Sequence, residues 1–321
     1  MPIPATFAGK LTLPVIASPM FIVSYPELVL AQCKAGIVGT FPSLNARQPG
    51  QLDEWLGRMT ADLADYAAAN PAQPVAPFGV NLIVHKSNTR LREDVELVVK
   101  HKVPLIITSV GAPTGIVEAV HSYGGLVFHD VTNIRHAKKA LSVGVDGLIL
   151  VAAGAGGHAG TLSPFALLSE VREFFDGPLV LAGAMSSGRS VRAAEVMGAD
   201  FAYIGTRFIA TAEANANEAY KQMLIDGAAS DIVYTPMFSG IPGNYLGPSI
   251  AANGIDPTAI SGGQADPNLS IEDWSKKKAW KDIWSAGQGI GTIHDAPSVA
   301  DLVARMKAEY RDAATTPSTF L

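Results

Sequence analysis

The stretch VGVDGLILVAAGAGGHAG, residues 143–160, joins a short apolar run to a glycine-rich turn. Residues 147–151 are apolar without alternation, which predicts a strand covered on both faces, as in a parallel sheet. Gly144 lies just before the run, where glycine commonly ends a helix before the chain enters a strand. The glycines after the run surround His158. The stretch therefore predicts a helix end, a buried strand and a turn that carries one titratable group.

The same rhythm recurs, with eight apolar runs that are each followed by glycine or polar residues. The runs are residues 15–17, 37–40, 78–82, 105–108, 126–129, 147–151, 179–182 and 201–204. Helical spacing of apolar residues marks 52–69, 91–100, 114–122, 134–143, 164–175, 187–197 and 212–226. Alternating strands and helices imply parallel strands, because a parallel crossover needs the length of a helix. Eight such units predict an α/β fold, a closed (β/α)8 TIM barrel, with a doubly wound open sheet as the alternative.

The rhythm stops after Asp226. Residues 229–275 are rich in Gly, Pro, Asn and Ser and are too long for an ordinary loop. We predict a barrel over 1–226, a smaller cap or substrate subdomain over 227–295 that also returns a segment to the ligand site, and a C-terminal helix and tail over 296–321. In the cap, Phe238 and Tyr245 are candidates to cover a substrate, with ordinary packing as the alternative.

Composition excludes several classes of protein. The 321 residues carry a net charge of −5, which argues against nucleic-acid binding. The one cysteine, Cys33, lies in an apolar helical stretch, so we expect a buried structural thiol and neither a disulfide within the chain nor a thiolate metal cluster. A signal-peptide pattern and an apolar run of about 20 residues are both missing. We therefore expect a cytoplasmic protein with no membrane partner.

In a barrel of this kind the active site lies at the carboxyl ends of the strands. The residues at those positions are Ser18, Pro19, Met20, Asn81, Ser109, His129, Asp130, residues 154–158, Gly183, Gly205 and Thr206. This set has no carboxylate and histidine cluster with metal-ligand spacing, no glycosidase carboxylate pair and no serine in a nucleophile elbow. The sequence therefore predicts no metal and few catalytic side chains.

The turns after the last two predicted strands carry a signal for phosphate. Gly183-Ala184 and Gly205-Thr206 each stand between a strand and a helix, where backbone N–H groups approach an anion closely. Simple turn chemistry is the alternative. A phosphate site among few catalytic side chains fits a cofactor that brings its own chemistry, and FMN fits this description. The backbone of residues 17–20, which includes Ala17, and the amide of Asn81 would then face the flavin ring.

The chain resembles the nitronate monooxygenase family, formerly called 2-nitropropane dioxygenases, over nearly its whole length. The shared motifs are ASPM at 17–20, FGVNL at 78–82, GGHAG at 156–160, GADFAYIGTRF at 198–208 and AGQGIG at 286–291. The resemblance implies an FMN-dependent oxidoreductase with a barrel and a smaller substrate domain. It implies that Met20 and Asn81 contact the flavin ring. It also implies that Gly183, Ala184, Gly205 and Thr206 hold the phosphate, and that Gln288 and Gly289 return to the same site.

Two positions depart from the family pattern. Ala184 stands where related sequences often have a second glycine, and an alanine N–H still reaches a phosphate if its φ is negative. Quinone reductases of this superfamily carry a basic residue after the fifth strand, where this chain has His129-Asp130. An anionic flavin needs a donor or a positive charge near N1 and the C2 carbonyl. His129 and a helix N-terminus are the candidates to supply it.

The resemblance makes His158 the active-site histidine, with Gly156 and Gly157 leaving room for flavin and substrate. As imidazolium it would hold a nitronate anion, and as neutral imidazole it would remove the α-proton of a nitroalkane. A histidine that only hydrogen-bonds its own loop is the alternative.

The expected reaction oxidises alkyl nitronates with dioxygen to a carbonyl compound and nitrite. One alternative on the same barrel is an NAD(P)H-dependent reductase of quinones or enoyl thioesters. A third is a phosphosugar isomerase or lyase, which would need a strand-end lysine or glutamate. The expected partners are a small-molecule substrate and dioxygen, with NAD(P)H and a second copy of the chain as further candidates.

Overall fold

The computed structural model describes residues 3–260 and 282–317. Eight parallel strands form one sheet in the order β1-β9-β8-β6-β5-β4-β3-β2. Their bounds are β1 Val15–Ala17, β2 Gly39–Pro42, β3 Phe78–Ile83, β4 Leu105–Ser109, β5 Leu126–Val131, β6 Gly147–Val151, β8 Leu179–Ala182 and β9 Phe201–Ile204. A bridge between Ile16 and Val38 joins the two ends of this sheet. The closed barrel is therefore confirmed, and the open sheet is excluded.

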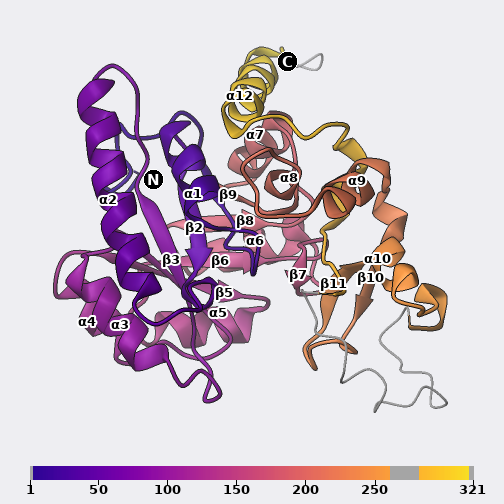
Figure 1. The fold of residues 1–321 in the computed structure, drawn as a ribbon, viewed down its shortest axis with the longest axis horizontal. Coiled ribbons are helices and arrows are strands. Elements are labelled where there is room, and N and C mark those ends of the chain that lie inside the picture. The colour runs from indigo at the N-terminus through magenta and orange to yellow at the C-terminus, as the bar shows by residue number, and fades with distance from the viewer. Residues whose placement is uncertain (1–2, 261–281, 318–321) are drawn as a thin grey trace.

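Helices surround the barrel (Figure 1). Their bounds are α1 Pro26–Lys34, α2 Gln51–Ala69, α3 Leu91–Lys100, α4 Ile116–His121, α5 Ile134–Leu141, α6 Pro164–Arg172, α7 Gly188–Val196, α8 Thr206–Ile209, α9 Glu218–Asp226, α10 Gly247–Ala252 and α12 Val299–Thr315. The prediction of a helix over 212–226 is wrong for residues 212–217, because α9 begins only at Glu218. Asn217 caps α9 by accepting from the N–H of Tyr220, which starts that helix at Glu218. Cys33 lies on α1 and is fully buried, as expected for a structural thiol.

The barrel is filled by side chains and closed at the amino end of its strands. Phe7 enters that end and packs edge-on against Phe201, with ring centroids 5.3 Å apart, and against Phe128 at 6.3 Å. Ile107 and Ile149 belong to the same buried cluster. Because this end is closed, a ligand has access only to the carboxyl ends of the strands.

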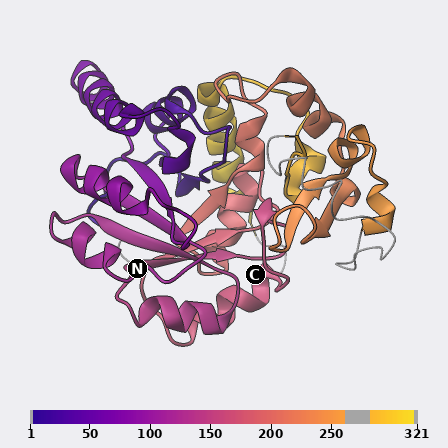
Figure 2. The same cartoon turned by 60° about the horizontal axis from the view of Figure 1, so that its bottom comes forward.

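A second, antiparallel sheet joins the segment after α9 to the turn after β6. It consists of β10 Ile232–Thr235, β11 Gly243–Leu246 and the two-residue β7 Gly157–His158, with β11 in the middle. Gly243 pairs with His158 and Asn244 pairs with Gly157. Figures 1 and 2 show β10 and β11 to one side of the barrel, with α10 beside them. The segment that holds the histidine therefore follows barrel strand β6 in the chain but pairs with the second sheet. The predicted boundary at residue 226 stays a prediction.

The C-terminal helix α12 returns to the barrel and packs against α7 (Figure 1). Contact at Gly188 is so close that an added Cβ would lie 1.8 Å from the carbonyl oxygen of Met306. Glu309 also accepts a hydrogen bond from the N–H of Gly188 at 2.7 Å. Residues 318–321 of the predicted tail and 261–281 of the predicted cap lie outside the described residues. Among the described helices, none combines the length and apolar character that a membrane span needs.

Candidate active site

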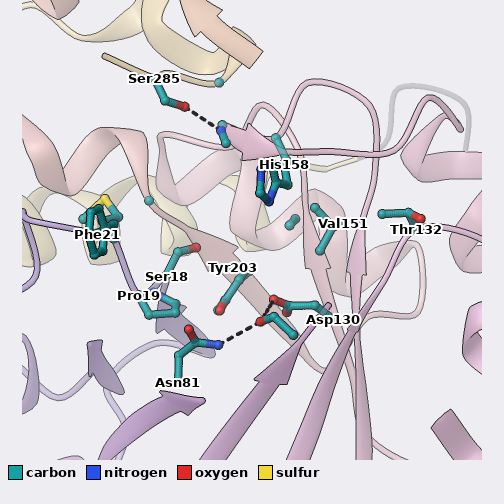
Figure 3. Close-up of a pocket in the computed structure, with 18 of the residues that line it drawn as sticks. Ser18, Pro19, Phe21, Asn81, Asp130, Thr132, Val151, His158, Tyr203 and Ser285 are labelled. Atoms are coloured by element: carbon teal, nitrogen blue, oxygen red, sulfur yellow. Dashed lines mark hydrogen bonds between the residues drawn. The ribbon is translucent and has the colours of Figure 1, made fainter. Parts of the chain in front are cut away.

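A cavity of about 810 Å³ opens at the carboxyl ends of the strands, a size typical of small-molecule and cofactor sites. Most residues singled out from the sequence line it. These are Ser18, Pro19, Met20, Asn81, Ser109, His129, Asp130, Gly156, Gly157, His158, Gly183, Ala184, Gly205, Thr206 and Gly289. The structure thus brings together strand ends that are far apart in the chain, such as Ser18 after β1 and Thr206 after β9. Figure 3 shows His158 on one side of this cavity and Asn81, Asp130 and Tyr203 on the other.

Four of the predicted site residues are not among those that line the cavity. Ala17 is fully buried, and its carbonyl accepts from the hydroxyl of Thr40. Gln288 is not a lining residue; its amide N–H donates to the carbonyl of Gly154 at 2.9 Å. Phe238 and Tyr245 pack edge to face with centroids 4.8 Å apart, and neither lines the cavity. A contact between these four residues and a ligand stays a prediction.

The glycines of the turn after β6 serve close packing between loops. A Cβ on Gly156 would lie 2.8 Å from the backbone nitrogen of Gly287, and a Cβ on Gly287 would lie 2.6 Å from the carbonyl oxygen of Gly154. Ser285 adds a bond, since its Oγ accepts from the N–H of Gly157 at 2.6 Å. The segment around 285–289 therefore rests directly on this turn and fixes its path.

The two expected phosphate turns differ from each other. Gly205 and Thr206 start α8, and no described residue accepts a hydrogen bond from either amide, which suits an anion. After β8, Gly183 has φ +141°, a conformation that glycine tolerates. Ala184 has φ +53°, so the negative φ on which its phosphate contact was expected to depend is wrong. Its N–H instead approaches the carbonyl of Gly154 at 3.3 Å.

His158 is held in one orientation by a hydrogen-bond network. Its Nε2 lies 2.8 Å from the Oγ of Ser239. Ser239 donates to the carbonyl of Ile241 at 3.0 Å and accepts from the hydroxyl of Tyr245 at 3.2 Å. Because the single hydroxyl proton of Ser239 is used on Ile241, Nε2 is the protonated ring nitrogen and Nδ1 the basic one. Burial lowers the pKa of His158 below its ordinary 6.5, so the imidazole is neutral at pH 7.

His129 does not supply the expected positive charge. Its Nδ1 lies 2.7 Å from the hydroxyl of Thr108, and the side chain is buried. Burial, with a smaller effect from His136, lowers the pKa of His129 to about 4. The ring is therefore neutral near pH 7 and contributes only hydrogen bonds.

Opposite His158, three polar side chains form a short chain of hydrogen bonds. Asn81 donates to the Oγ of Ser109 at 2.8 Å, and Ser109 donates to Oδ2 of Asp130 at 2.6 Å. Burial raises the pKa of Asp130 to about 7, and the bond from Ser109 lowers it by less. The Oδ1 atom of Asp130 and the hydroxyl of Tyr203 are buried without a hydrogen-bond partner among the described residues.

Tyr203 was missed in the sequence, where it reads as one more apolar strand residue. A signal was available, because side chains two apart on a strand share a face. Phe201 belongs to the core inside the barrel, so Tyr203 must point the same way, one residue before the strand ends. Its hydroxyl therefore comes to the floor of the cavity.

The comparisons with known proteins now decide the family. The family model described as nitronate monooxygenase matches residues 6–309. The chain belongs to the nitronate monooxygenase family. A nitronate monooxygenase of Paraburkholderia phytofirmans is 25% identical, over 93% of this chain and 92% of that protein.

Solved structures share the fold. FabK from Thermotoga maritima has a TM-score of 0.75 at 22% identity, covering 95% of this chain and 94% of that one. Nitroalkane oxidase from Streptomyces ansochromogenes has a TM-score of 0.76 at 22% identity, covering 97% and 99%.

Membership of this family makes the chain an oxidoreductase on a TIM barrel, in a family whose members are in general flavin enzymes. The resemblance seen in the sequence is confirmed. The isomerase or lyase alternative is excluded, since those enzymes belong to another reaction class. The strand ends that line the cavity also lack the lysine or glutamate that such an enzyme would need.

Proposed function

We propose that the protein binds FMN in the cavity and oxidises alkyl nitronates with dioxygen to a carbonyl compound and nitrite. The observation that carries the proposal is His158, a neutral and oriented imidazole on the wall of an 810 Å³ cavity, in a chain of the nitronate monooxygenase family. When bound, FMN would supply the electron-transfer chemistry that the side chains around the cavity lack.

The residues present fit this cofactor. The backbone amides of Gly205 and Thr206 would hold the phosphate, because N–H groups without acceptors at a helix start favour an anion. The backbone amide of Gly183, in the turn after β8, would add a further donor. Met20 and Asn81 line the cavity and would contact the ring. The unpartnered polar atoms of Asp130 and Tyr203 provide hydrogen-bonding groups that a ring with carbonyl oxygens satisfies.

The role of His158 follows from its protonation. A neutral imidazole with a basic Nδ1 would remove the α-proton of a neutral nitroalkane. A nitronate has already lost this proton and needs no base. We therefore propose that His158 is the base for nitroalkanes, and that nitronates react without proton transfer to its Nδ1.

The test begins with the colour of the purified protein. We expect a yellow protein with the absorption spectrum of FMN, and oxygen uptake when a nitronate such as propyl-2-nitronate is added. A colourless protein whose absorption spectrum shows no bound FMN after FMN is added would contradict the proposal.

The second candidate is an NAD(P)H-dependent reductase of quinones or enoyl thioesters. It is favoured by FabK, which shares the fold as closely as nitroalkane oxidase does. The two candidates separate when NADH consumption with a quinone is compared with oxygen uptake on a nitronate. Rapid NADH oxidation by the FMN-loaded protein, without oxygen uptake when a nitronate is added, would support the reductase.

A further inference from the structure

The direction of the hydrogen bonds on the cavity floor can be worked out from the chemistry of each group. Asn81 Nδ2 lies 3.2 Å from the carbonyl oxygen of Ile107, which can only accept, and this fixes the orientation of the amide. The same nitrogen donates to Ser109, so the proton of Ser109 goes on to Oδ2 of Asp130. Oδ2 is therefore an acceptor. If Asp130 carries a proton, the proton sits on Oδ1.

Among residues 3–260 and 282–317, no cation forms an ion pair with Asp130 that would stabilise its ionised form. The groups that face it are Ser109 from β4, Asn81 from β3 and Tyr203 from β9. Across or beside the cavity, His129 and His158 are neutral at pH 7 because burial lowers the pKa of each. His136 and Lys139 on α5 also line the cavity, but both are exposed to solvent. A neutral carboxyl group is therefore the form that this environment favours.

Tyr203 adds a second donor at the same place. The residue is 8% exposed, and its hydroxyl has no partner among the described residues. Burial, with a smaller effect from Asp130, holds the pKa of Tyr203 well above its ordinary value, so the hydroxyl keeps its proton. A buried donor without an acceptor is destabilising, because it has lost its hydrogen bonds to water and gained none in return. Two such groups on one cavity floor point to a ligand with a hydrogen-bond-accepting edge.

We propose that Asp130, as a neutral carboxylic acid, donates from Oδ1 to the accepting nitrogen and carbonyl edge of the isoalloxazine ring, and that Tyr203 donates to the same edge. This inference rests on the proposed FMN site. Loss of the proton of Asp130 removes the donor and places a negative charge beside the ring.

The experiment is a pH titration of the FMN-loaded protein, followed by the visible absorption of the flavin. From about pH 6 to about pH 9 we expect one spectral transition, because a charge that appears beside the ring shifts its bands. In Asp130→Asn the transition should vanish, since the amide keeps a donor but does not titrate. Asp65→Asn, an exposed aspartate on α2, serves as the matched control and should titrate like the parent.

Two further variants keep the test decisive if Asp130→Asn loads FMN poorly. Ser109→Ala removes the bond that favours the ionised carboxylate, so the transition should move to higher pH. Tyr203→Phe should leave the transition in place and weaken FMN binding about fivefold. An FMN-loaded parent without a transition, or the same transition in Asp130→Asn, overturns this inference alone. A protein that takes up no FMN overturns the proposed function as well.

Discussion

At the scale of single residues, the neutral state of His158 leads to a kinetic prediction. In His158→Asn, kcat/KM for a neutral nitroalkane should fall about a hundredfold or more, whereas kcat/KM for the matching nitronate should fall much less. The reason is that only the nitroalkane needs a base. Steady-state oxygen uptake on both substrates measures the ratio, with FMN content checked by absorbance. Equal losses on both substrates would show that His158 is not the base.

The lowered pKa of His158 also predicts a pH profile. The neutral imidazole is the active form of a base, and it is lost only as the pH falls through a pKa that lies below 6.5. Activity on the nitroalkane should therefore be retained below pH 6.5 and fall at lower pH. A plot of kcat/KM against pH measures this. If kcat/KM already falls as the pH is lowered from 8 to about 7, the assignment of a neutral imidazole at pH 7 is contradicted.

Ala184 is one of the non-glycine residues whose backbone adopts a left-handed conformation. A left-handed conformation costs a non-glycine residue about 1–2 kcal/mol. Ala184→Gly should therefore raise the free energy of unfolding by about 1 kcal/mol, as measured by urea denaturation. The control is Ala193→Gly, an exposed position inside α7, where the same exchange should lower the free energy of unfolding by a similar amount.

At the scale of elements, the short pairing between β7 and β11 holds the backbone of His158. A Cβ on Gly243 would lie 2.9 Å from the carbonyl oxygen of Gly157. We expect Gly243→Ala to push β11 away from β7, and to lower kcat/KM about tenfold with FMN still bound, because a displaced catalytic group loses its alignment. Gly57→Ala on α2, where the nearest atom is 3.7 Å away, is the matched control and should leave activity unchanged. Normal activity of Gly243→Ala would show that the pairing does not position His158.

The elements were the part of the structure that the sequence predicted best. All eight barrel strands appear within about two residues of the predicted bounds, because buried parallel strands give continuous apolar runs between glycine turns. The pairing of β7 with β11 was not foreseen. A strand of two residues is too short to show periodicity, and its pairing partners lie 85 and 87 residues further along the chain. The capped start of α9 depends on Asn217, a signal that the apolar pattern of 212–226 concealed.

At the scale of the whole molecule, α12 fastens the C-terminal segment to the barrel through Gly188. A methyl group there would overlap the carbonyl of Met306, and overpacking typically costs about 1–3 kcal/mol. Gly188→Ala should lower the midpoint of thermal unfolding by several degrees, while the FMN spectrum at low temperature stays normal. An unchanged midpoint would show that α12 moves away from α7 without cost.

The arrangement of the site was only partly predictable at this scale. Strand order placed His158, Asn81 and Asp130 around one cavity, because parallel strand ends meet at one rim of a barrel. The rotation of each side chain was not predictable. Tyr245 therefore turned out to support Ser239 behind His158, where a covering role had been expected. The missing charge at His129 depends on burial, which a pattern of residue types does not give.

The double anchoring of the turn around His158 limits how a substrate can arrive. That wall is tied to β11 and to Ser285, so it is a poor candidate for a moving gate. On other parts of the rim, Phe21 and Val110 line the cavity and are 38% and 49% exposed. Val110 has φ +79°, an uncommon conformation for a β-branched residue. We therefore expect substrate to enter and product to leave past Phe21 and Val110. Substitutions at Val110 should then alter the rates of substrate entry and product release and leave the chemistry at His158 unchanged.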